Sequence, residues 1–327
     1  MTSPLAISLP LNGVDARRGV DAARRAADLG YTAAWLAEVQ GPDAFTQLGA
    51  LAVTTALDLG VAVVPAQTRT PMVLGMSAVT LSQLSGGRFT LGIGASSELI
   101  VDRWAGQPFD KPLTTVRETF EALRPMLRGE RTTFEGERVE VHGYRPHATP
   151  EPAVPLYLGA LNQKSLRMVG ELGADGLCLN QMGAQHVPQM LDLVREGAGG
   201  TLPEGFGVVA RLFCMVVDDV DFGRTIVKHT FGPYIATSVY NRFYRWMGYE
   251  EEAQAILDAD GDRDAQAAAI SDRLVDDIFL IGPAEAVADR IRAFVEAGVT
   301  VPVVQPMAAD LQQAEGMWQA IAAAYRA

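Results

Sequence analysis

Short apolar runs alternate with longer amphipathic stretches along almost the whole chain. Residues 5–9 and 32–36 are apolar runs typical of β-strands, and residues 15–29 between them have the period of an amphipathic helix. On that helix we expect the buried face to consist of Ala16, Val20, Ala23 and Ala27. The chain therefore opens with a predicted strand–helix–strand unit.

The same alternation continues to the C-terminus. We predict further strands at residues 59–64, 89–93, 155–159, 176–179, 207–217 and 301–305. We predict the other helices at residues 43–56, 71–84, 112–127, 163–172, 185–196, 283–297 and 311–325. Strands joined through helices by short turns form parallel βαβ units, and eight of them close most economically into a (β/α)8 barrel of the TIM type. Residues 278–281 are treated as an extended link, and a doubly wound open sheet is the structural alternative.

We expect one domain over residues 1–327, because no linker rich in Gly, Ser or Pro divides the chain. Three insertions are expected to interrupt the barrel. Residues 96–111 predict a long loop, residues 132–144 (TTFEGERVEVHGY) predict a hairpin, and residues 222–282 predict a mainly helical insertion.

Composition and charge narrow the class of protein. The chain carries 27 Lys and Arg against 39 Asp and Glu, a net charge of −12, so it lacks the basic surface of a nucleic-acid or membrane binder. Its 48% apolar and 20% charged residues exclude a disordered chain. Cys178 and Cys214 lie in apolar runs, where we expect buried free thiols. Without a basic N-terminal segment or a long apolar run, we expect a cytoplasmic protein.

Candidate chemistry lies where the predicted strands end, because ligands of such barrels bind at the C-terminal ends of the strands. These positions carry mostly neutral hydrogen-bonding side chains: Glu38, Gln40, Gln67, Arg69, Ser96, Ser97, Asn162, Asn180, Gln181 and Gln305. A facing pair of carboxylates, a Cys/His cluster and the HExxH and GxSxG motifs are all missing, so we expect no glycosidase, no catalytic metal and no serine nucleophile. Amides and hydroxyls suit a protein that holds an organic cofactor and substrate.

The order of motifs resembles a known family. VVPAQTRTP (residues 63–71) and SGGRFTLGIG (residues 85–94) resemble the bacterial-luciferase-like superfamily. Four further segments resemble its F420-dependent branch: IVDRWAGQPFDKPL (100–113), the hairpin EGERVEV (135–141), VPLYLGALNQKSLRMVGELGADG (154–176) and GPAEAVADRIRAFVEAGV (282–299). The resemblance covers nearly the whole chain. It implies a TIM-type barrel, a homodimer, and an oxidoreductase that transfers a hydride between the deazaflavin coenzyme F420 and a small organic substrate.

The resemblance also implies a cofactor site. In this family a non-prolyl cis peptide after the third strand supports the deazaflavin ring, and the matching bond here joins Ala62 to Val63. The cofactor phosphate is expected near the loops after the fourth and fifth strands. The expected cofactor-binding residues are Ala62, Val63, Gly94, Ser96, Ser97, Gly159, Ala160, Leu161, Asn162 and Asn180. Asn162 is also a predicted helix N-cap.

Two features bear on the substrate. Glu38 matches the position that lies near the reactive ring edge in this family, so we predict that it is catalytic; a solvated or salt-bridged carboxylate is the alternative. Residues 231–249 contain seven aromatic side chains. As a lid they would form a substrate pocket, and as a helix core or dimer interface they would pack against protein. The predicted pocket residues are Tyr234, Tyr240, Phe243 and Trp246.

Two other functions stay open at this point. The first is an FMN-dependent luciferase-like monooxygenase on the same fold, which would use O2. The second is a flavin-binding barrel without catalytic activity, since a fold alone does not guarantee activity. Turnover separates the non-catalytic barrel from the two enzymes. Isotopic oxygen in the product separates the monooxygenase from the F420-dependent enzyme.

Overall fold

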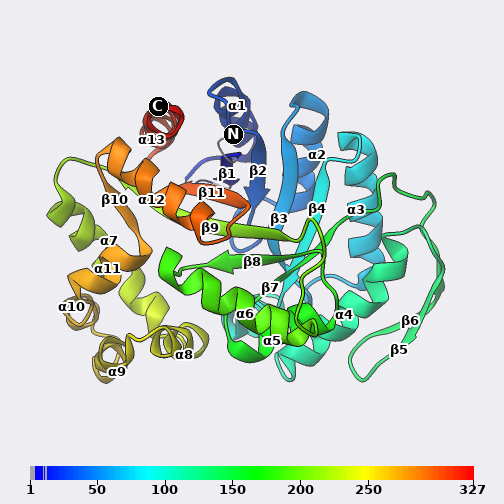
Figure 1. The fold of residues 1–327 in the computed structure, drawn as a ribbon. Coiled ribbons are helices and arrows are strands. Elements are labelled where there is room, and N and C mark those ends of the chain that lie inside the picture. The colour runs from blue at the N-terminus through cyan, green and yellow to red at the C-terminus, as the bar shows by residue number, and fades with distance from the viewer. Residues whose placement is uncertain (1–3, 10, 12) are drawn as a thin grey trace.

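The computed structural model describes residues 4–9, 11 and 13–327. Eight parallel strands form a closed barrel that is surrounded by helices (Figure 1). The barrel strands are β1 (Ala6–Leu9), β2 (Ala33–Leu36), β3 (Asp58–Pro65), β4 (Phe89–Gly94), β7 (Leu156–Gly159), β8 (Gly176–Asn180), β9 (Gly207–Val216) and β11 (Val301–Pro306). They pair in this order, and β11 pairs with β1 to close the ring. The predicted (β/α)8 barrel is confirmed.

Helices connect these strands across the outside of the barrel. They are α1 (Ala16–Asp28), α2 (Ala44–Thr54), α3 (Pro71–Ser85), α4 (Pro112–Met126), α5 (Gln163–Glu171), α6 (Val187–Gly197), α12 (Ala284–Glu296) and α13 (Leu311–Arg326). The chain ends N and C lie on the same side of the molecule, where α1 and α13 are neighbours (Figure 1). Each of these helices lies within a few residues of its predicted position.

The buried face of α1 differs from the prediction. The structure buries Gly19, Ala22, Ala23 and Ala26. Ala16 is exposed at the first turn, so the predicted face is wrong by about one residue. The reason lies at Gly19, where a Cβ atom would come within 2.4 Å of the Gln47 side-chain amide on α2. Close approach of two helices at a glycine leaves no apolar side chain for a hydrophobic pattern to detect.

Two pieces of the chain add strands outside the closed barrel. β5 (Thr132–Glu135) and β6 (Glu140–Tyr144) form the predicted antiparallel hairpin. The run predicted as an extended link contains β10 (Leu280–Gly282), three residues that pair with the end of β9. The link is therefore a short strand, and the barrel still closes through β11 as predicted.

The insertions lie on different sides of the barrel. Between β9 and β10 the chain forms α7 (Val220–Ile235), α8 (Ser238–Trp246), α9 (Glu250–Asp258), α10 (Arg263–Ala268) and α11 (Asp272–Ile278). This group covers one side, at the left of Figure 1, and the β5–β6 hairpin projects from the opposite side. The segment predicted as a long loop after β4 contains a π-helical turn, η1 (Leu99–Trp104).

Two aromatic side chains fill the interior of the barrel. The rings of Trp35 (β2) and Tyr157 (β7) pack with centroids 6.1 Å apart. Glycines make room for them. A Cβ atom on Gly60 would lie 2.4 Å from the Trp35 ring, and one on Gly207 would lie 1.8 Å from the Tyr157 hydroxyl. Gly207 is the first residue of β9, so the Tyr157 side chain that packs on it fills the N-terminal end of the barrel interior.

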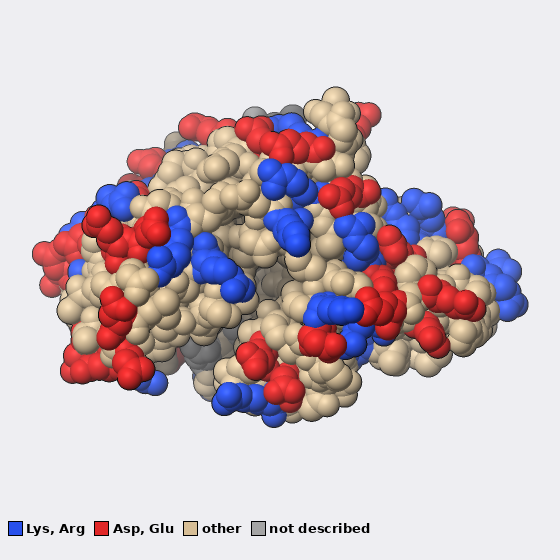
Figure 2. All heavy atoms as spheres, turned by 90° about the horizontal axis from the view of Figure 1, so that it is seen from below, with Lys and Arg blue, Asp and Glu red and all other residues tan. Residues whose placement is uncertain are grey.

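Charged side chains of both signs lie on the surface of the molecule. The face seen from below carries acidic and basic side chains interspersed, and basic side chains border a hollow near its centre (Figure 2). Cys178 and Cys214 are buried free thiols, as predicted, and burial raises the pKa of Cys214 to about 12. Within the described residues, no helix has the length and apolar character required to cross a bilayer.

Candidate functional site at the mouth of the barrel

The C-terminal end of β3 has unusual backbone geometry. The Ala62–Val63 peptide bond is cis, as the family resemblance implied. At the same place the pairing of β3 with β4 shifts register between Val61 and Val64. The Val63 side chain faces Gly94 at the end of β4 and Gly159 at the end of β7, where added Cβ atoms would approach it to 2.7 and 2.9 Å. Four of the predicted cofactor residues thus meet in one wall of small side chains.

The loops after β4 and β7 continue this wall. These strands are hydrogen-bonded neighbours, so Ser96 and Ser97 leave the barrel beside the turn that leads into α5. Asn162 caps α5, as predicted: its side-chain oxygen accepts from the Ser165 N–H at 2.9 Å, and its own N–H donates to Ser165 Oγ at 3.1 Å. Ser96 has a left-handed backbone with φ of 60°, a conformation that is uncommon for non-glycine residues and is found repeatedly at functional sites.

Glu38 lies at the mouth and is held in an ion pair. Arg69 Nη2 donates to Glu38 Oε1 at 2.6 Å, and Arg69 Nε donates to Glu38 Oε2 at 3.2 Å. Arg69 also pairs with Asp43, the N-cap of α2. The hydrogen bonds to Glu38 raise the pKa of Arg69 above its ordinary value. The salt-bridged arrangement anticipated as the alternative is present, and it holds the Glu38 carboxyl group in place.

Two amide side chains at the mouth have buried atoms without partners. Both polar atoms of the Gln67 amide, just after β3, lack a hydrogen-bond partner in the described part of the chain, and so does Oδ1 of Asn180 at the end of β8. Buried polar groups are nearly always paired, so unpaired amides at the mouth of such a barrel suggest a missing ligand. The dione edge of a deazaflavin ring offers carbonyl oxygens and an N–H, which match such amides. The residues present fit this cofactor.

The helix α8 docks directly on the end of β8. Asn180 Nδ2 donates to the Tyr240 hydroxyl at 3.1 Å, and the Tyr244 hydroxyl donates to Gln181 Oε1 at 3.1 Å. A third contact comes from η2 (Ala184–His186), where His186 Nε2 lies 3.2 Å from the Met247 carbonyl oxygen. Three hydrogen bonds therefore tie the aromatic segment to the rim of the barrel.

The four predicted pocket residues take different positions. Tyr240 lies at the mouth, and the partly exposed Tyr234 packs on it with ring centroids 4.5 Å apart. Phe243 is 1% exposed and belongs to the main hydrophobic core. Trp246 is partly buried and packs on Phe243 at 6.1 Å. The first pair faces the mouth, and the second pair packs within the insertion.

One charged residue at the site was missed by the sequence analysis. Arg211 on β9 shares the inward phase of Val209, which lies inside the barrel. Its Nη2 and Nε donate to Gln305 Oε1 on β11, at 2.6 and 3.2 Å. Burial lowers the pKa of Arg211. A lone arginine inside the apolar run VVARLFCMVV, at an inward position, was the signal available in the sequence.

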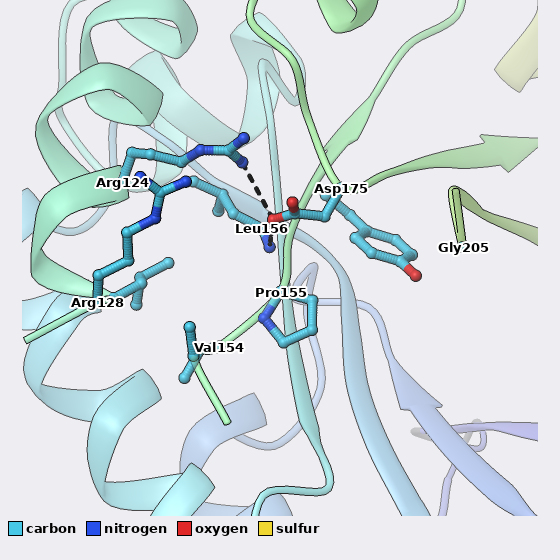
Figure 3. Close-up of a pocket in the computed structure, with 10 residues that line it drawn as sticks. Arg124, Arg128, Val154, Pro155, Leu156, Asp175 and Gly205 are labelled. Carbon is cyan, nitrogen blue, oxygen red and sulfur yellow. Dashed lines mark hydrogen bonds and ion pairs between the residues drawn. The ribbon is translucent and has the colours of Figure 1, made fainter. Parts of the chain in front are cut away.

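A cavity of about 280 Å³ lies at the opposite end of the barrel. Figure 3 shows Arg124 of α4 and Arg128 of the following turn beside it, and the ion pair from Arg124 Nη1 to Asp175 Oδ2 measures 3.0 Å. Leu156 and Gly205, at the starts of β7 and β9, also line it. Because chemistry in such barrels occurs at the C-terminal ends of the strands, we assign the site to the mouth. Among the described residues no cluster of His, Cys, Asp and Glu is arranged to bind a metal.

A cofactor-binding α/β barrel with an aromatic cover is the class that this fold and site define. The family model of the luciferase-like monooxygenases matches residues 4–301. The protein therefore belongs to the luciferase-like monooxygenase family, as the motifs indicated.

Named relatives narrow the comparison. The chain is 29% identical to a candidate coenzyme F420-dependent oxidoreductase of Mycobacterium tuberculosis, over 87% of this chain and 89% of that protein. It is 28% identical to the 5,10-methylenetetrahydromethanopterin reductase of Archaeoglobus fulgidus, over 84% and 85% of the two chains.

Solved structures agree in fold. The coenzyme F420-dependent tetrahydromethanopterin reductase of Methanopyrus kandleri superposes with a TM-score of 0.81 at 22% identity, covering 98% of both chains. An F420-dependent secondary alcohol dehydrogenase, in complex with an F420-acetone adduct, superposes with a TM-score of 0.80 at 18% identity over the full length of both. The expected oxidoreductase class and the expected cofactor agree with the names of these proteins.

Proposed function

We propose that this protein is an F420-dependent oxidoreductase that transfers a hydride between the deazaflavin and a small organic substrate. The observation that carries the proposal is the unpaired amide of Gln67 next to the wall of Val63, Gly94 and Gly159. A flat ring with carbonyl and N–H groups satisfies both features, and the named relatives support F420 as that ring. Bound F420 supplies the hydride or takes it up at its ring carbon C5.

In this reaction the protein's side chains would bind the cofactor, orient the substrate against it and exclude water from both. In this proposal Val63, Gly94 and Gly159 support one side of the ring, while Gln67 and Asn180 bond its polar edge. The remaining predicted cofactor contacts are Ala62, Ser96, Ser97, Ala160, Leu161 and Asn162. Glu38, held in place by Arg69, accepts a proton from the substrate or returns it. Tyr234 and Tyr240 cover the substrate side.

The first test is an equilibrium titration of the purified protein with F420 and, separately, with FMN. We expect F420 to bind at least ~30-fold more tightly than FMN, a difference of about 2 kcal/mol. The reverse preference, with O2 consumed, would establish the monooxygenase instead. Binding without turnover of any hydride donor or acceptor would favour the non-catalytic barrel.

Two variants test the placement of the cofactor. Gln67→Leu should weaken F420 binding about tenfold, the value of one or two buried hydrogen bonds, whereas Gln319→Leu on the exposed side of α13 should not. Asn162→Asp keeps the helix cap but adds a negative charge near the expected phosphate, so affinity should fall. Thr201→Asp, an exposed control near the other end of the barrel, should leave affinity unchanged.

We also propose that the protein is a homodimer that associates through α2 and α3. These adjacent helices contain 11 and 15 residues and no Asp, Glu, Lys or Arg. They nevertheless expose large apolar side chains, including Val53 at 63% and Met76 at 44%. An uncharged apolar face is compatible with a copy of itself in a twofold interface. We further propose that residues 1–327 form a single domain within each subunit.

Light scattering after size-exclusion chromatography tests the dimer. The double variant Val53→Glu and Met76→Glu should run as a monomer, because four charges would meet across the interface. Leu257→Glu on α9, a residue of similar exposure at 42%, should leave the dimer intact. A wild-type protein that is monomeric at micromolar concentration would overturn this proposal and leave the proposed reaction untouched.

A further inference from the structure

Arg211 is a cation without a counter-ion inside the barrel mouth. Among the residues that the structure describes, no carboxylate oxygen lies within 4.0 Å of its guanidinium. The amide oxygen of Gln305 is its hydrogen-bonding partner, and that oxygen is neutral. Arg69, the other arginine at the mouth, is neutralised by Glu38 and Asp43, whereas the partly buried Arg88 and Arg290 use both Nη atoms to donate to backbone carbonyl oxygens.

The geometry leaves part of the guanidinium unused. Arginine carries five N–H donors in a planar fork. Nε and Nη2 each direct a hydrogen to Gln305, and Nη1 has no partner within the described chain. Gln305 thus fixes the plane of the guanidinium while leaving one edge with donors available. A fixed arginine edge is the arrangement that proteins use for two-point recognition of carboxylates.

Burial makes an unpaired charge unfavourable unless other interactions compensate for the lost hydration. Removing a cation from water without pairing it costs several kcal/mol, and the pKa of Arg211 is lowered for this reason. The neighbouring groups offer no negative charge in return. The Phe213 ring lies 5.0 Å from the guanidinium carbon, and cation–π contact compensates only part of such a cost. An anionic ligand would supply the rest.

The surroundings also limit the shape of this ligand. Arg211 lies on β9, in register with Asn180 on β8, and β8 also contacts the Tyr240 hydroxyl. The Phe213 ring contacts the guanidinium, and Tyr240 is bonded to the Asn180 side chain next to it. Val63, Gly94 and Gly159 of the expected ring site belong to β3, β4 and β7, and Asn180 on β8 lies between them and β9. Arg211 thus lies at the far edge of the expected ring site, next to the aromatic segment.

We propose that Arg211, oriented by Gln305, binds the carboxylate of the substrate, so that the substrates of this enzyme are small planar or aromatic organic acids. The inference rests on the proposed function, because it assigns the anion that Arg211 would bind to the substrate. It makes Arg211 a specificity-determining residue and predicts that neutral analogues of a substrate are discriminated against.

The test uses benzoate and benzamide as probes, a matched pair that differs in the negative charge. Binding is measured by calorimetry on the whole protein, with and without saturating F420. We expect benzoate to bind the wild type and to bind Arg211→Gln at least tenfold more weakly, while benzamide binds both weakly and equally. Arg211→Lys keeps the charge but loses the fork, and we expect an intermediate affinity. Arg128→Gln, at the opposite end of the barrel, should bind benzoate like the wild type.

Folding of the variants is checked separately by thermal unfolding. Arg211 has no carboxylate partner that its removal would leave buried and unpaired. We therefore expect Arg211→Gln to melt no lower than the wild type. Benzoate binding that is equal in Arg211→Gln and wild type, or absent from the wild type with and without F420, would overturn the inference.

F420 titration of the same samples separates this inference from the proposed function. Unchanged F420 affinity in Arg211→Gln supports a substrate role, whereas a loss of at least tenfold would assign the arginine to the cofactor and overturn the inference. A wild type that binds benzoate through Arg211 but does not bind F420 would retain the anion site and refute the proposed function.

Discussion

The two ends of the barrel differ in how completely their interior groups are packed and paired. At the N-terminal end the side chains of Trp35 and Tyr157 fill the interior and pack against glycines. At the mouth, Gln67 has an unpaired amide and Arg211 has no counter-ion within the described residues. The difference indicates that one end has been built for stability and the other left incomplete for a ligand.

Removing the aromatic filling should have the largest effect on stability. Trp35→Ala should lower the free energy of unfolding by about 3–5 kcal/mol, because it opens a cavity that the rigid barrel cannot collapse. Trp104→Ala, at a tryptophan that is 50% exposed, should change it by less than about 1 kcal/mol. Urea denaturation measures both. Equal losses would mean that the barrel interior is not the main source of stability.

Changing the candidate proton-transfer group should affect turnover and not folding. Glu38→Gln should reduce kcat about 100-fold, or about 2.7 kcal/mol of barrier, if Glu38 exchanges a proton with the substrate. Arg69 keeps Asp43 as its partner, so the fold should tolerate the change. Asp43→Asn removes charge from the same cluster and serves as the control. If both variants retain full turnover, Glu38 has only the structural role of an ion-pair partner.

Glu118 on α4, outside the barrel, is a buried carboxylate with both oxygens paired, and it contrasts with the unpaired amide of Gln67. Its carboxylate accepts from the N–H groups of Glu137, Arg138 and Val139 at 2.7–2.9 Å. Glu118→Gln should cost about 2 kcal/mol, since an amide offers one acceptor oxygen instead of two. Glu137→Gln breaks only a surface ion pair with Lys111 and should cost less than ~0.5 kcal/mol. Hydrogen exchange of the hairpin amides should reveal the difference locally.

The smallest expected effect is a pH dependence of the docking of α8. Desolvation lowers the pKa of His186 below its ordinary value of 6.5, with smaller effects of both signs from Asp277 and Arg273. The Gly183 N–H donates to Nδ1, so a neutral ring carries its proton on Nε2, facing the Met247 carbonyl. Above about pH 6.5 the ring is neutral in both the folded and the unfolded chain. As the pH falls below this value the unfolded chain binds a proton first, and stability decreases.

Thermal unfolding between pH 7.5 and 5.5 checks this expectation. The midpoint should decrease on the acidic side, and His186→Gln should make that decrease smaller. His142, an exposed histidine on the hairpin, provides the control, because His142→Gln should leave the slope unchanged. A slope that is the same in the wild type and in His186→Gln would show that other groups control the acid response.

The sequence predicted the site unevenly, for identifiable reasons. Asn162 was recognisable because a cap is a local interaction between a side chain and the next turn. The ion pair of Glu38 with Arg69 was anticipated only as an alternative, since its members are 31 residues apart and meet through the ends of neighbouring strands. Phe243 and Tyr240 lie in the same helix, but only contacts with β8 and the core separate a mouth residue from a packing residue. These contacts are tertiary.

The order of apolar strands and amphipathic helices by itself determined that the protein is an eight-stranded parallel barrel, because βαβ units leave few ways to bury both faces of a sheet. Family motifs determined which strand ends to inspect. The tertiary structure alone decided which polar groups are paired there, since strands distant in sequence, such as β9 and β11, bring Arg211 to Gln305 and leave it without a carboxylate. Pairing depends on distances of a few ångströms across the closed barrel, which a linear pattern of residue types does not encode.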